Sequence, residues 1–236
     1  MSKLLNVSSS PHVRCGVSTK NLMYDVAIAM LPATIWGVMQ FGIYSLIVVV
    51  ATVLSCVLSE YLFETLMHKP VTISDGSALV TGMILGLNMP PAIPLWMPIL
   101  GGVFAIIVVK QLYGGLGQNW MNPALAARCF MLISFAQAMT KFTDPVTDAV
   151  ASATPLAAIK AGDTYDLAAM FIGKIPGTIG EVSVIALLIG AAYLLVKKVI
   201  TIRIPAAYIL SFAVFAFIFG QHNINYVLAE VCGGGL

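Results

Sequence analysis

Residues 76–109 read GSALVTGMILGLNMPPAIPLWMPILGGVFAIIVV and contain no Asp, Glu, Lys or Arg. A second uncharged run covers residues 26–59 and has the same length of 34 residues. A helix needs about 20 apolar residues to cross a bilayer, so each run is long enough for two crossings joined by a turn. The two runs predict an all-α, polytopic helical membrane protein.

The overall composition agrees with this fold class. Of the 236 residues, 59% are hydrophobic and 9% are charged, whereas about 25% of the residues in a soluble domain are charged. A net charge of +2 leaves no clustered basic face for a nucleic-acid partner. The cysteines Cys15, Cys56, Cys129 and Cys232 form no CxxC pair, so their spacing does not favour a zinc or iron–sulfur site.

Seven membrane spans are predicted, one of them short. They cover roughly Met23–Phe41, Ile43–Phe63, Gly76–Met89, Leu95–Leu112, Pro123–Met139, Ile179–Val196 and Ile204–Gly220. The third has 14 residues, or about 21 Å of helix, against a hydrocarbon core of about 30 Å. Because Pro90 and Pro91 stop it, we expect a broken helix that does not cross the bilayer as a regular span.

These spans divide the chain into four parts. Residues 1–22 form an N-terminal segment, residues 23–139 hold five spans, residues 140–178 form a long loop, and residues 179–236 hold further spans. An apolar stretch that begins at Tyr226 runs to the last residue, so we expect the membrane domain to continue beyond it.

The basic residues predict the orientation, because cytoplasmic loops carry an excess of Lys and Arg. With a cytoplasmic N-terminus, nine basic residues fall inside and three outside. The inner set is Lys3, Arg14, Lys20, Lys69, Lys110, Arg128, Lys197, Lys198 and Arg203, and the outer set is Lys141, Lys160 and Lys174. The loop of residues 140–178 is therefore expected outside the cytoplasm. This layout places no acidic residue in the middle of a span, so it singles out no ion ligand.

The segment SDGSALVTG, residues 74–82, has two interpretations. In one, Ser74 or Asp75 caps a helix, and Ala78, Gly82 and Gly86 form a face of small residues for close helix packing. In the other, a discontinuous helix lines a binding site, as in transporters, which makes Asp75 and Thr81 candidate ligand-binding residues. Residue chemistry alone does not decide between them.

A glycine-rich turn, GGLGQNWMNP, precedes the fifth span. Asn122 followed by Pro123 predicts a helix start with Asn122 as the N-cap. Arg128, two turns into that helix, is costly at membrane depth unless it is paired. It either reaches the interface with its long side chain or faces protein or a cavity, so Arg128 and Asn122 are further candidates for a binding site.

The loop of residues 140–178 contains DAVASATPLA, residues 148–157. Thr154 followed by Pro155 predicts an N-cap and the first residue of a short helix. The free N–H groups at a helix start bind anions such as phosphate.

Four segments occur in an order that resembles one family. They are VSSSPHVR (7–14), SDGSALVTG (74–82), GGLGQNWMNPALAAR (114–128) and DAVASATPLA (148–157). Together they resemble the D-type subunit of the Rnf ion-translocating ferredoxin:NAD oxidoreductases, and its relative, the B-type subunit of the sodium-pumping NADH:quinone oxidoreductases. The resemblance covers essentially the whole chain, and the short segment before the first span fits the Rnf protein better.

The resemblance implies an FMN joined through its phosphate to a threonine in a D-x-x-[ST]-G-A-T pattern. Asp148 matches the first position, and Ala153 and Thr154 match the last two. The chain departs from the pattern at Ala151 and at Ser152, which stand at the Ser/Thr and Gly positions. Thr154 is thus the expected attachment site, and a second, non-covalent flavin is left open.

The resemblance also implies a function, a location and partners. The chain would be an electron-carrying subunit of a translocase in the prokaryotic inner membrane, with other Rnf subunits as partners, among them an extracytoplasmic one that carries another FMN. The pumped cation, Na⁺ or H⁺, is left open. A secondary transporter or channel without a cofactor and an inert scaffold subunit are the alternatives from other classes.

Overall fold

A computed structural model describes residues 18–143, 150–151, 167–220 and 224–232. The predicted flavin-site residues Asp148, Ser152, Ala153 and Thr154 lie outside these ranges. The described elements are α1 (Thr19–Phe41), α2 (Ile43–Leu66), η1 (Ile73–Asp75), α3 (Ser77–Leu87), α4 (Trp96–Val103), η2 (Phe104–Gln111), α5 (Pro123–Ser134), α6 (Ala136–Met139), β1 (Phe142–Thr143), β2 (Val150–Ala151), α8 (Leu167–Ile172), α9 (Val184–Val196), α10 (Arg203–Phe219) and α11 (Ile224–Glu230).

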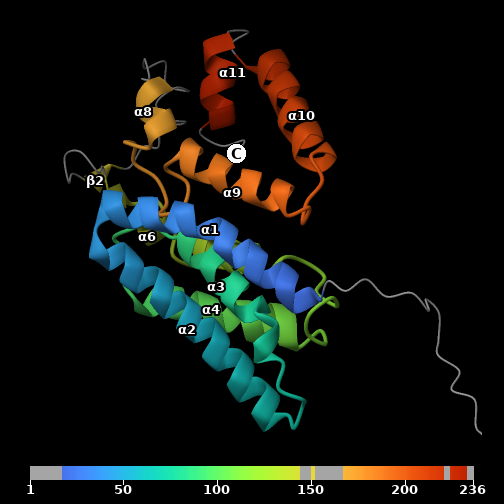
Figure 1. The fold of residues 1–236 in the computed structure, drawn as a ribbon. Coiled ribbons are helices and arrows are strands. Elements are labelled where there is room, and N and C mark those ends of the chain that lie inside the picture. Colours follow the sequence, from blue (N-terminus) through green and yellow to red (C-terminus); the bar gives the residue numbers. More distant parts are fainter. Residues whose placement is uncertain (1–17, 144–149, 152–166, 221–223, 233–236) are drawn as a thin grey trace, which may run out of the picture.

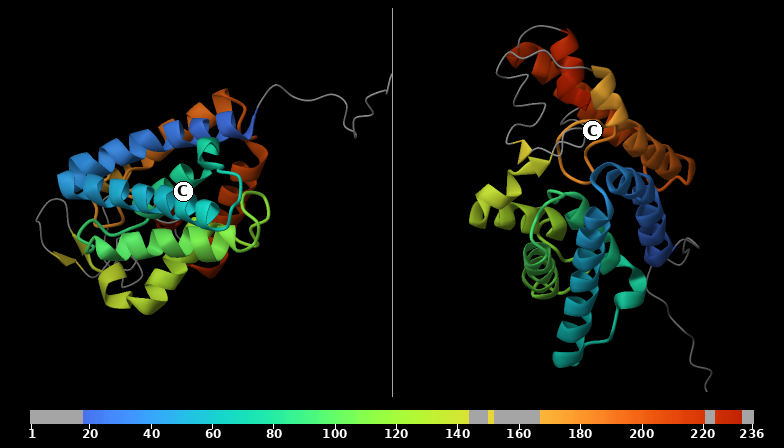
Figure 2. Two further views of the ribbon diagram at one scale, coloured as in Figure 1. Left: turned by 90° about the horizontal axis from the view of Figure 1, so that it is seen from below. Right: turned by 90° about the vertical axis from the view of Figure 1, so that its left-hand side faces the viewer.

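The helices form two groups that meet along α1. The helices α1 to α6 pack into one bundle, α9 lies along α1, and α8, α10 and α11 lie on the far side of α9 (Figure 1). Figure 2 shows the same arrangement from two further sides. Apart from the paired strands β1 and β2, which the sequence did not predict, the regular structure in the described residues is helical.

Helices α1 and α2, with 23 and 24 residues, are long and apolar enough to cross a membrane. Gly42 joins them with φ of +82°, which confirms the predicted turn because glycine adopts this conformation without strain. Among the described residues, five further apolar helices are shorter, at 10 to 17 residues. With its apolar composition, this arrangement is that of a helical membrane protein.

Helix α3 is short and packs closely on α2. A Cβ atom on Gly82 would lie 2.6 Å from the Val53 Cα, and one on Gly86 would lie 3.0 Å from the Val49 Cα. The small residues therefore let the two backbones approach, as the packing interpretation predicted. The helix ends at Leu87, before the two prolines, so the predicted early stop is confirmed.

The chain after α3 returns to the beginning of α2 without a helix. The Tyr44 hydroxyl donates to the Ile93 carbonyl at 2.9 Å, while Ser77, at the other end of α3, lies close to Glu60 near the end of α2. Residues 77–93 therefore cover most of the length of α2, the larger part as helix and the remainder as irregular chain.

Three of the predicted spans differ from the observed helices. The fourth helix, Trp96–Gln111, is a π-helix over its second half, Phe104–Gln111. The fifth breaks at Phe135 into α5 and α6. The sixth begins at Val184 instead of Ile179, because the Ile179 and Gly180 N–H groups donate to the Met89 and Leu87 carbonyls at the end of α3, at 3.1 and 2.8 Å.

Candidate functional site

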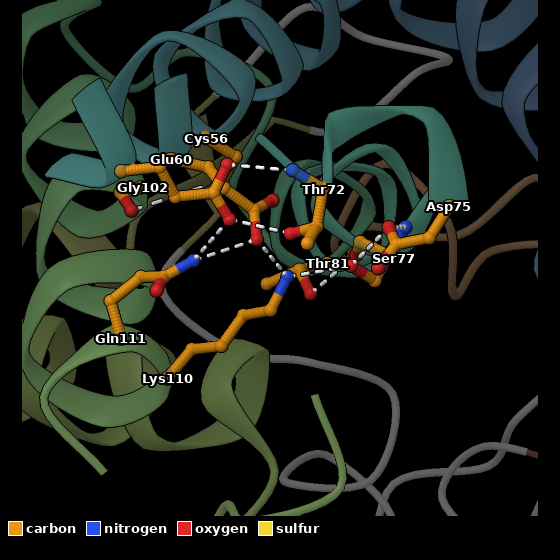
Figure 3. Close-up of polar contacts among 10 residues, drawn as sticks. Cys56, Glu60, Thr72, Asp75, Ser77, Thr81, Gly102, Lys110 and Gln111 are labelled. Atoms are coloured by element: carbon orange, nitrogen blue, oxygen red, sulfur yellow. Dashed lines mark hydrogen bonds and ion pairs between the residues drawn. The ribbon is translucent and has the colours of Figure 1, made fainter. Parts of the chain in front are cut away.

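A buried polar network lies where the end of α2, the start of α3 and the end of η2 meet (Figure 3). The Lys110 ammonium donates to Glu60 Oε1 at 2.5 Å and to Ser77 Oγ at 2.6 Å. Glu60 and Lys110 are 0% and 1% exposed. A charged pair that is shielded from solvent to this degree is stable only with near-ideal geometry and further hydrogen bonds.

A second carboxylate extends this network. Gln111 Nε2 donates to Glu60 Oε1 at 2.9 Å and to Glu64 Oε1 at 3.2 Å. The Thr72 N–H and hydroxyl donate to the two oxygens of Glu64, at 2.9 and 2.5 Å. Glu60 and Glu64 are four residues apart on α2, so one helix face presents both to the interior.

The network holds more negative than positive charge. Glu60 and Glu64 face the single ammonium of Lys110, and Glu60 Oε2 is buried without a hydrogen-bond partner in the described part of the chain. A buried carboxylate oxygen without a partner costs free energy that a proton or a cation would offset. Within the described ranges, no group of three or more acidic, His or Cys side chains is arranged to hold a metal ion.

The candidates Asp75 and Thr81 border this network but have local roles. Asp75 Oδ1 accepts from the Ser77 N–H and hydroxyl at 2.7 and 2.6 Å, so it caps α3 and orients Ser77 toward Lys110. The Thr81 hydroxyl donates to the Ser77 carbonyl at 2.9 Å within α3. These local hydrogen bonds agree with the capping interpretation of the segment, whereas ligand binding by Asp75 and Thr81 stays a prediction.

Arg128 lies in a second polar cluster at the opposite end of α3. Its Nη1 donates to Asn88 Oδ1 at 2.7 Å, and its Nη2 is 4.0 Å from Glu181 Oε2. The Thr178 hydroxyl donates to the same Glu181 oxygen at 2.9 Å. Arg128 therefore faces protein, which decides between its two predicted positions.

The remaining described candidate, Asn122, is a helix cap. Its Oδ1 accepts from the Ala124 and Leu125 N–H groups at 3.0 and 3.3 Å. It also borders a cavity of about 470 Å³ in which Tyr113 and Trp120 lie with ring centroids 5.9 Å apart. The structure therefore does not bring the four described candidates to one site: Asp75 and Thr81 lie at the start of α3, and Arg128 at its end.

The centre of the buried network was not predicted from the sequence. No acidic residue was expected in the middle of a span, yet Glu60 lies within the predicted second span and is fully buried. Lys110, counted among the charges of the inner side, is buried as well. The available signal was the position of Glu60, six residues before the end of α2, with Glu64 one turn later on the same face.

Comparison with known proteins identifies the family. The NQR2, RnfD, RnfE family matches residues 6–236. The chain belongs to this family. The D-type subunit of a Na(+)-translocating ferredoxin:NAD(+) oxidoreductase complex from Acetobacterium woodii is 46% identical over 231 residues, which cover 95% of this chain and 73% of that protein.

Two further relatives carry related names. The D-type subunit of a proton-translocating ferredoxin:NAD(+) oxidoreductase complex from Clostridium ljungdahlii is 39% identical, over 92% of this chain and 70% of that protein. The D-type subunit of an ion-translocating oxidoreductase complex from Methanosarcina acetivorans is 31% identical, over 94% and 71%. The resemblance to the Rnf D-type subunit is thereby confirmed. The cation differs between the names of the first two relatives.

Proposed function

We propose that this member of the family is the D-type membrane subunit of a redox-driven cation pump that couples ferredoxin and NAD oxidoreduction. Family membership and the names of its relatives support the assignment. The observation that carries it is the buried network of Glu60, Glu64 and Lys110, because intramembrane ionisable groups are costly and mark ion paths or proton relays.

In this proposal the network carries the charge of the translocated cation. The unpartnered oxygen of Glu60 takes up a proton or pairs with a monovalent cation, and Lys110 keeps the remaining charge balanced. Ser77 accepts a hydrogen bond from Lys110, and Gln111 donates one to Glu60, so both charged side chains are held in position. Both Na⁺ and H⁺ satisfy this charge balance.

We place the protein in the prokaryotic inner membrane with seven spans, the N-terminus inside and residues 140–178 outside. The excess of basic residues at one side supports this orientation even without Arg128, which lies at the opposite end of α3 from Lys110. Lys20 and Lys197, at the start of α1 and the end of α9, then share the inner side, and the contact between Lys197 and Asp25 supports this pairing of helix ends. The partners would be the other Rnf subunits, including an extracytoplasmic one that carries an FMN.

We further propose that Thr154 carries a covalent FMN. Support comes from the pattern of Asp148, Ala153 and Thr154 and from the helix start expected at Pro155. The half-exposed charges of Arg128 and Glu181, of which Glu181 lines a cavity, support the presence of a polar ligand near this loop. When bound, the flavin would accept and release electrons one or two at a time.

We also propose that a second, non-covalent flavin would bind in the cavity beside Asn122. Its walls include Phe104, Tyr113 and Trp120, whose flat rings suit stacking on an aromatic ligand. The volume of about 470 Å³ lies within the range of small-ligand sites.

In-gel fluorescence tests the covalent site. The protein is produced in its complex together with a flavin transferase, denatured and scanned for flavin. Thr154→Ala should abolish the fluorescent band, because no phosphoester can form without the hydroxyl. Ser152→Ala, the matched control, should keep it. A band that persists in Thr154→Ala would reject the assignment.

A further inference from the structure

The buried network of Glu60, Glu64 and Lys110 reaches the surface at the loop between α2 and η1. Residues 65–72, from the last turn of α2 into this loop, are exposed. The Thr72 hydroxyl and N–H donate to the two carboxylate oxygens of Glu64, and the Lys69 N–H donates to the Glu64 carbonyl at 2.8 Å. The loop therefore folds over Glu64, and the Thr72 hydroxyl is the outermost described group of the network.

From Thr72, polar groups lead inward along one face of α2. Glu64 is 2% exposed and Glu60 is fully buried. One amide nitrogen, Gln111 Nε2, donates to Oε1 of both carboxylates, at 3.2 Å to Glu64 and 2.9 Å to Glu60. The order from the surface to the interior is thus hydroxyl, carboxylate, amide, carboxylate. We call Thr72, Glu64, Gln111 and Glu60 the inlet.

Beyond Glu60, close helix packing ends the inlet. About one turn deeper on α2, a Cβ atom on Gly102 of α4 would lie 2.8 Å from Ser55 Oγ. Near the next turn, a Cβ atom on Gly82 of α3 would lie 2.6 Å from the Val53 Cα. Helices α3 and α4 thus leave no room for an added carbon atom beside α2 at these positions. The described polar groups therefore form a one-sided passage with its closed end at Glu60.

Lys110 occupies this closed end. From the last turn of η2, its ammonium reaches Glu60 Oε1 and Ser77 Oγ, at 2.5 and 2.6 Å (Figure 3). Glu60 Oε2, by contrast, is buried without a hydrogen-bond partner among the described residues. Two carboxylates and one ammonium leave a negative charge uncompensated, which is costly in a buried site until a cation arrives. Since like charges repel, the ammonium also opposes the passage of a cation beyond Glu60.

We propose that Thr72 and Glu64 form a one-sided entrance through which a small monovalent cation, Na⁺ or H⁺, reaches Glu60, and that Lys110 closes its inner end. The inference rests on the proposed function and adds the route to it. Hydroxyl and carboxylate oxygens suit hard cations, and chains of acidic side chains also pass protons. In the proposed orientation the loop after α2 lies inside, so the entrance faces the cytoplasm.

The half-saturating cation concentration for transport by the intact complex in vesicles tests the entrance. Transport is driven by ferredoxin and NAD oxidoreduction. It is measured against Na⁺ at fixed pH, and against pH in Na⁺-free buffer, so that the two cations are separated. Glu64→Gln removes a negative charge that concentrates cations, so it should raise the half-saturating concentration of the transported cation about tenfold or more. The maximal rate should fall by less, whereas a general disturbance of the fold would lower the maximal rate.

The measurement against pH also reports on the other titratable groups around the inlet. Cys56 lies one turn deeper on α2, and Asp75 lies beside Ser77. The loop adds His68 and Lys69. Since these groups are present in every variant, only a difference between Glu64→Gln and wild type is assigned to the entrance.

Two threonines provide matched surface variants, which keep the test valid if Glu64→Gln assembles poorly. Thr72→Val keeps the backbone N–H that donates to Glu64 but loses the hydroxyl, so it should raise the half-saturating concentration by a smaller factor. Thr72→Ser keeps the hydroxyl and should bring the value back toward wild type. Thr65→Val is the control, because Thr65 is exposed and has no described side-chain hydrogen bond to the inlet.

The effect of cations on stability tests the closed end. In Lys110→Met, Glu60 has lost its ammonium, so the transported cation should raise the melting temperature of the complex more than it does in wild type, because a ligand of the folded state stabilises it. Lys110→Met/Glu60→Gln should not respond. Equal responses of wild type and Lys110→Met would overturn the role of Lys110.

The outcome for Glu60→Gln separates this inference from the proposed function. Suppose that Glu60→Gln abolishes transport, while Glu64→Gln and Thr72→Val keep the half-saturating concentrations of both cations at the wild-type values. That result would overturn the entrance and leave the proposed function intact. Full, coupled transport in Glu60→Gln would overturn both.

Discussion

The two polar clusters at the ends of α3 each pair a basic side chain with a carboxylate. The cluster at the start of α3 is buried, and we call it the closed cluster; the cluster at the end of α3 is half-exposed, and we call it the open cluster. At the start of α3, Lys110 and Glu60 are 2.5 Å apart and almost fully buried. At its end, Arg128 and Glu181 are 4.0 Å apart and remain 36% and 47% exposed. A hydrogen bond from Lys110 to Ser77 and one from Gln111 to Glu60 complete the first cluster, whereas the second opens on a cavity.

The difference separates two tasks. A closed pair in a low-dielectric interior holds a fixed balance of charge, and removing one partner strands the other at a large cost. An open pair contributes little to stability, because its charged atoms are 4.0 Å apart and its side chains are half-exposed. It remains free to contact a ligand. This difference agrees with the proposed function, in which the closed cluster carries the charge of the cation and the open cluster is free to contact a ligand.

The largest effect is expected in the closed cluster. Lys110→Met leaves Glu60 buried without its cation and should lower the free energy of unfolding by about 3–5 kcal/mol. Thermal unfolding of the detergent-solubilised complex measures this. The double variant Lys110→Met/Glu60→Gln is the control, since it removes both charges and should recover most of the stability but not cation transport into vesicles. Equal stability of single and double variants would contradict a coupled pair.

The second-largest loss of stability is expected where α3 packs on α2, because α3 connects the two clusters. Gly82→Ala places a Cβ atom 2.6 Å from the Val53 backbone, which cannot move aside cheaply. We expect a loss of about 1–3 kcal/mol. Gly101→Ala, whose Cβ atom would meet the flexible Met131 side chain at 3.4 Å, should cost much less. Similar melting temperatures for the two variants would show that the close approach is not limiting.

The closed cluster also marks where sequence reasoning failed, and the helix ends mark where it succeeded. Gly42, the early stop of α3 and the cap at Asn122 were predictable because each depends on the conformational preferences of a few neighbouring residues. The Glu60–Lys110 pair joins residues 50 positions apart and depends on how α2 and η2 pack. The packing of the helices, and not the local sequence pattern, therefore determines whether this pair forms.

The sequence predicted only part of the open cluster. The cost of Arg128 at membrane depth indicated a partner, but its partners Asn88 and Glu181 come from an irregular segment and a loop whose paths no periodicity describes. The delayed start of α9 has the same origin. The backbone of Ile179 and Gly180 hydrogen-bonds to the end of α3 instead of continuing a helix.

A smaller effect is expected where α5 begins, about two turns before Arg128. Asn122→Ala removes the side-chain acceptor for two N–H groups and should cost about 1 kcal/mol. Asn122→Ser keeps a capping oxygen and should cost only a fraction of that. Because fraying would loosen α5 and not η2, hydrogen exchange should increase around Ala124 and Leu125 and stay unchanged at Lys110. Faster exchange at Lys110 as well would mean that the two clusters unfold together.

The smallest effect on stability is expected for the open pair itself. Arg128→Gln keeps a side-chain amide that can donate to Asn88, and it removes a charge whose partner is 4.0 Å away. Glu181→Gln keeps an acceptor for the Thr178 hydroxyl. Since loose, half-exposed pairs contribute about 0–1 kcal/mol, each variant should melt close to wild type, and the double variant should equal the sum of the two. A loss as large as that of Lys110→Met, or strong non-additivity, would show that this cluster is closed in the assembled complex, and the assignment of its charges to a ligand would fail.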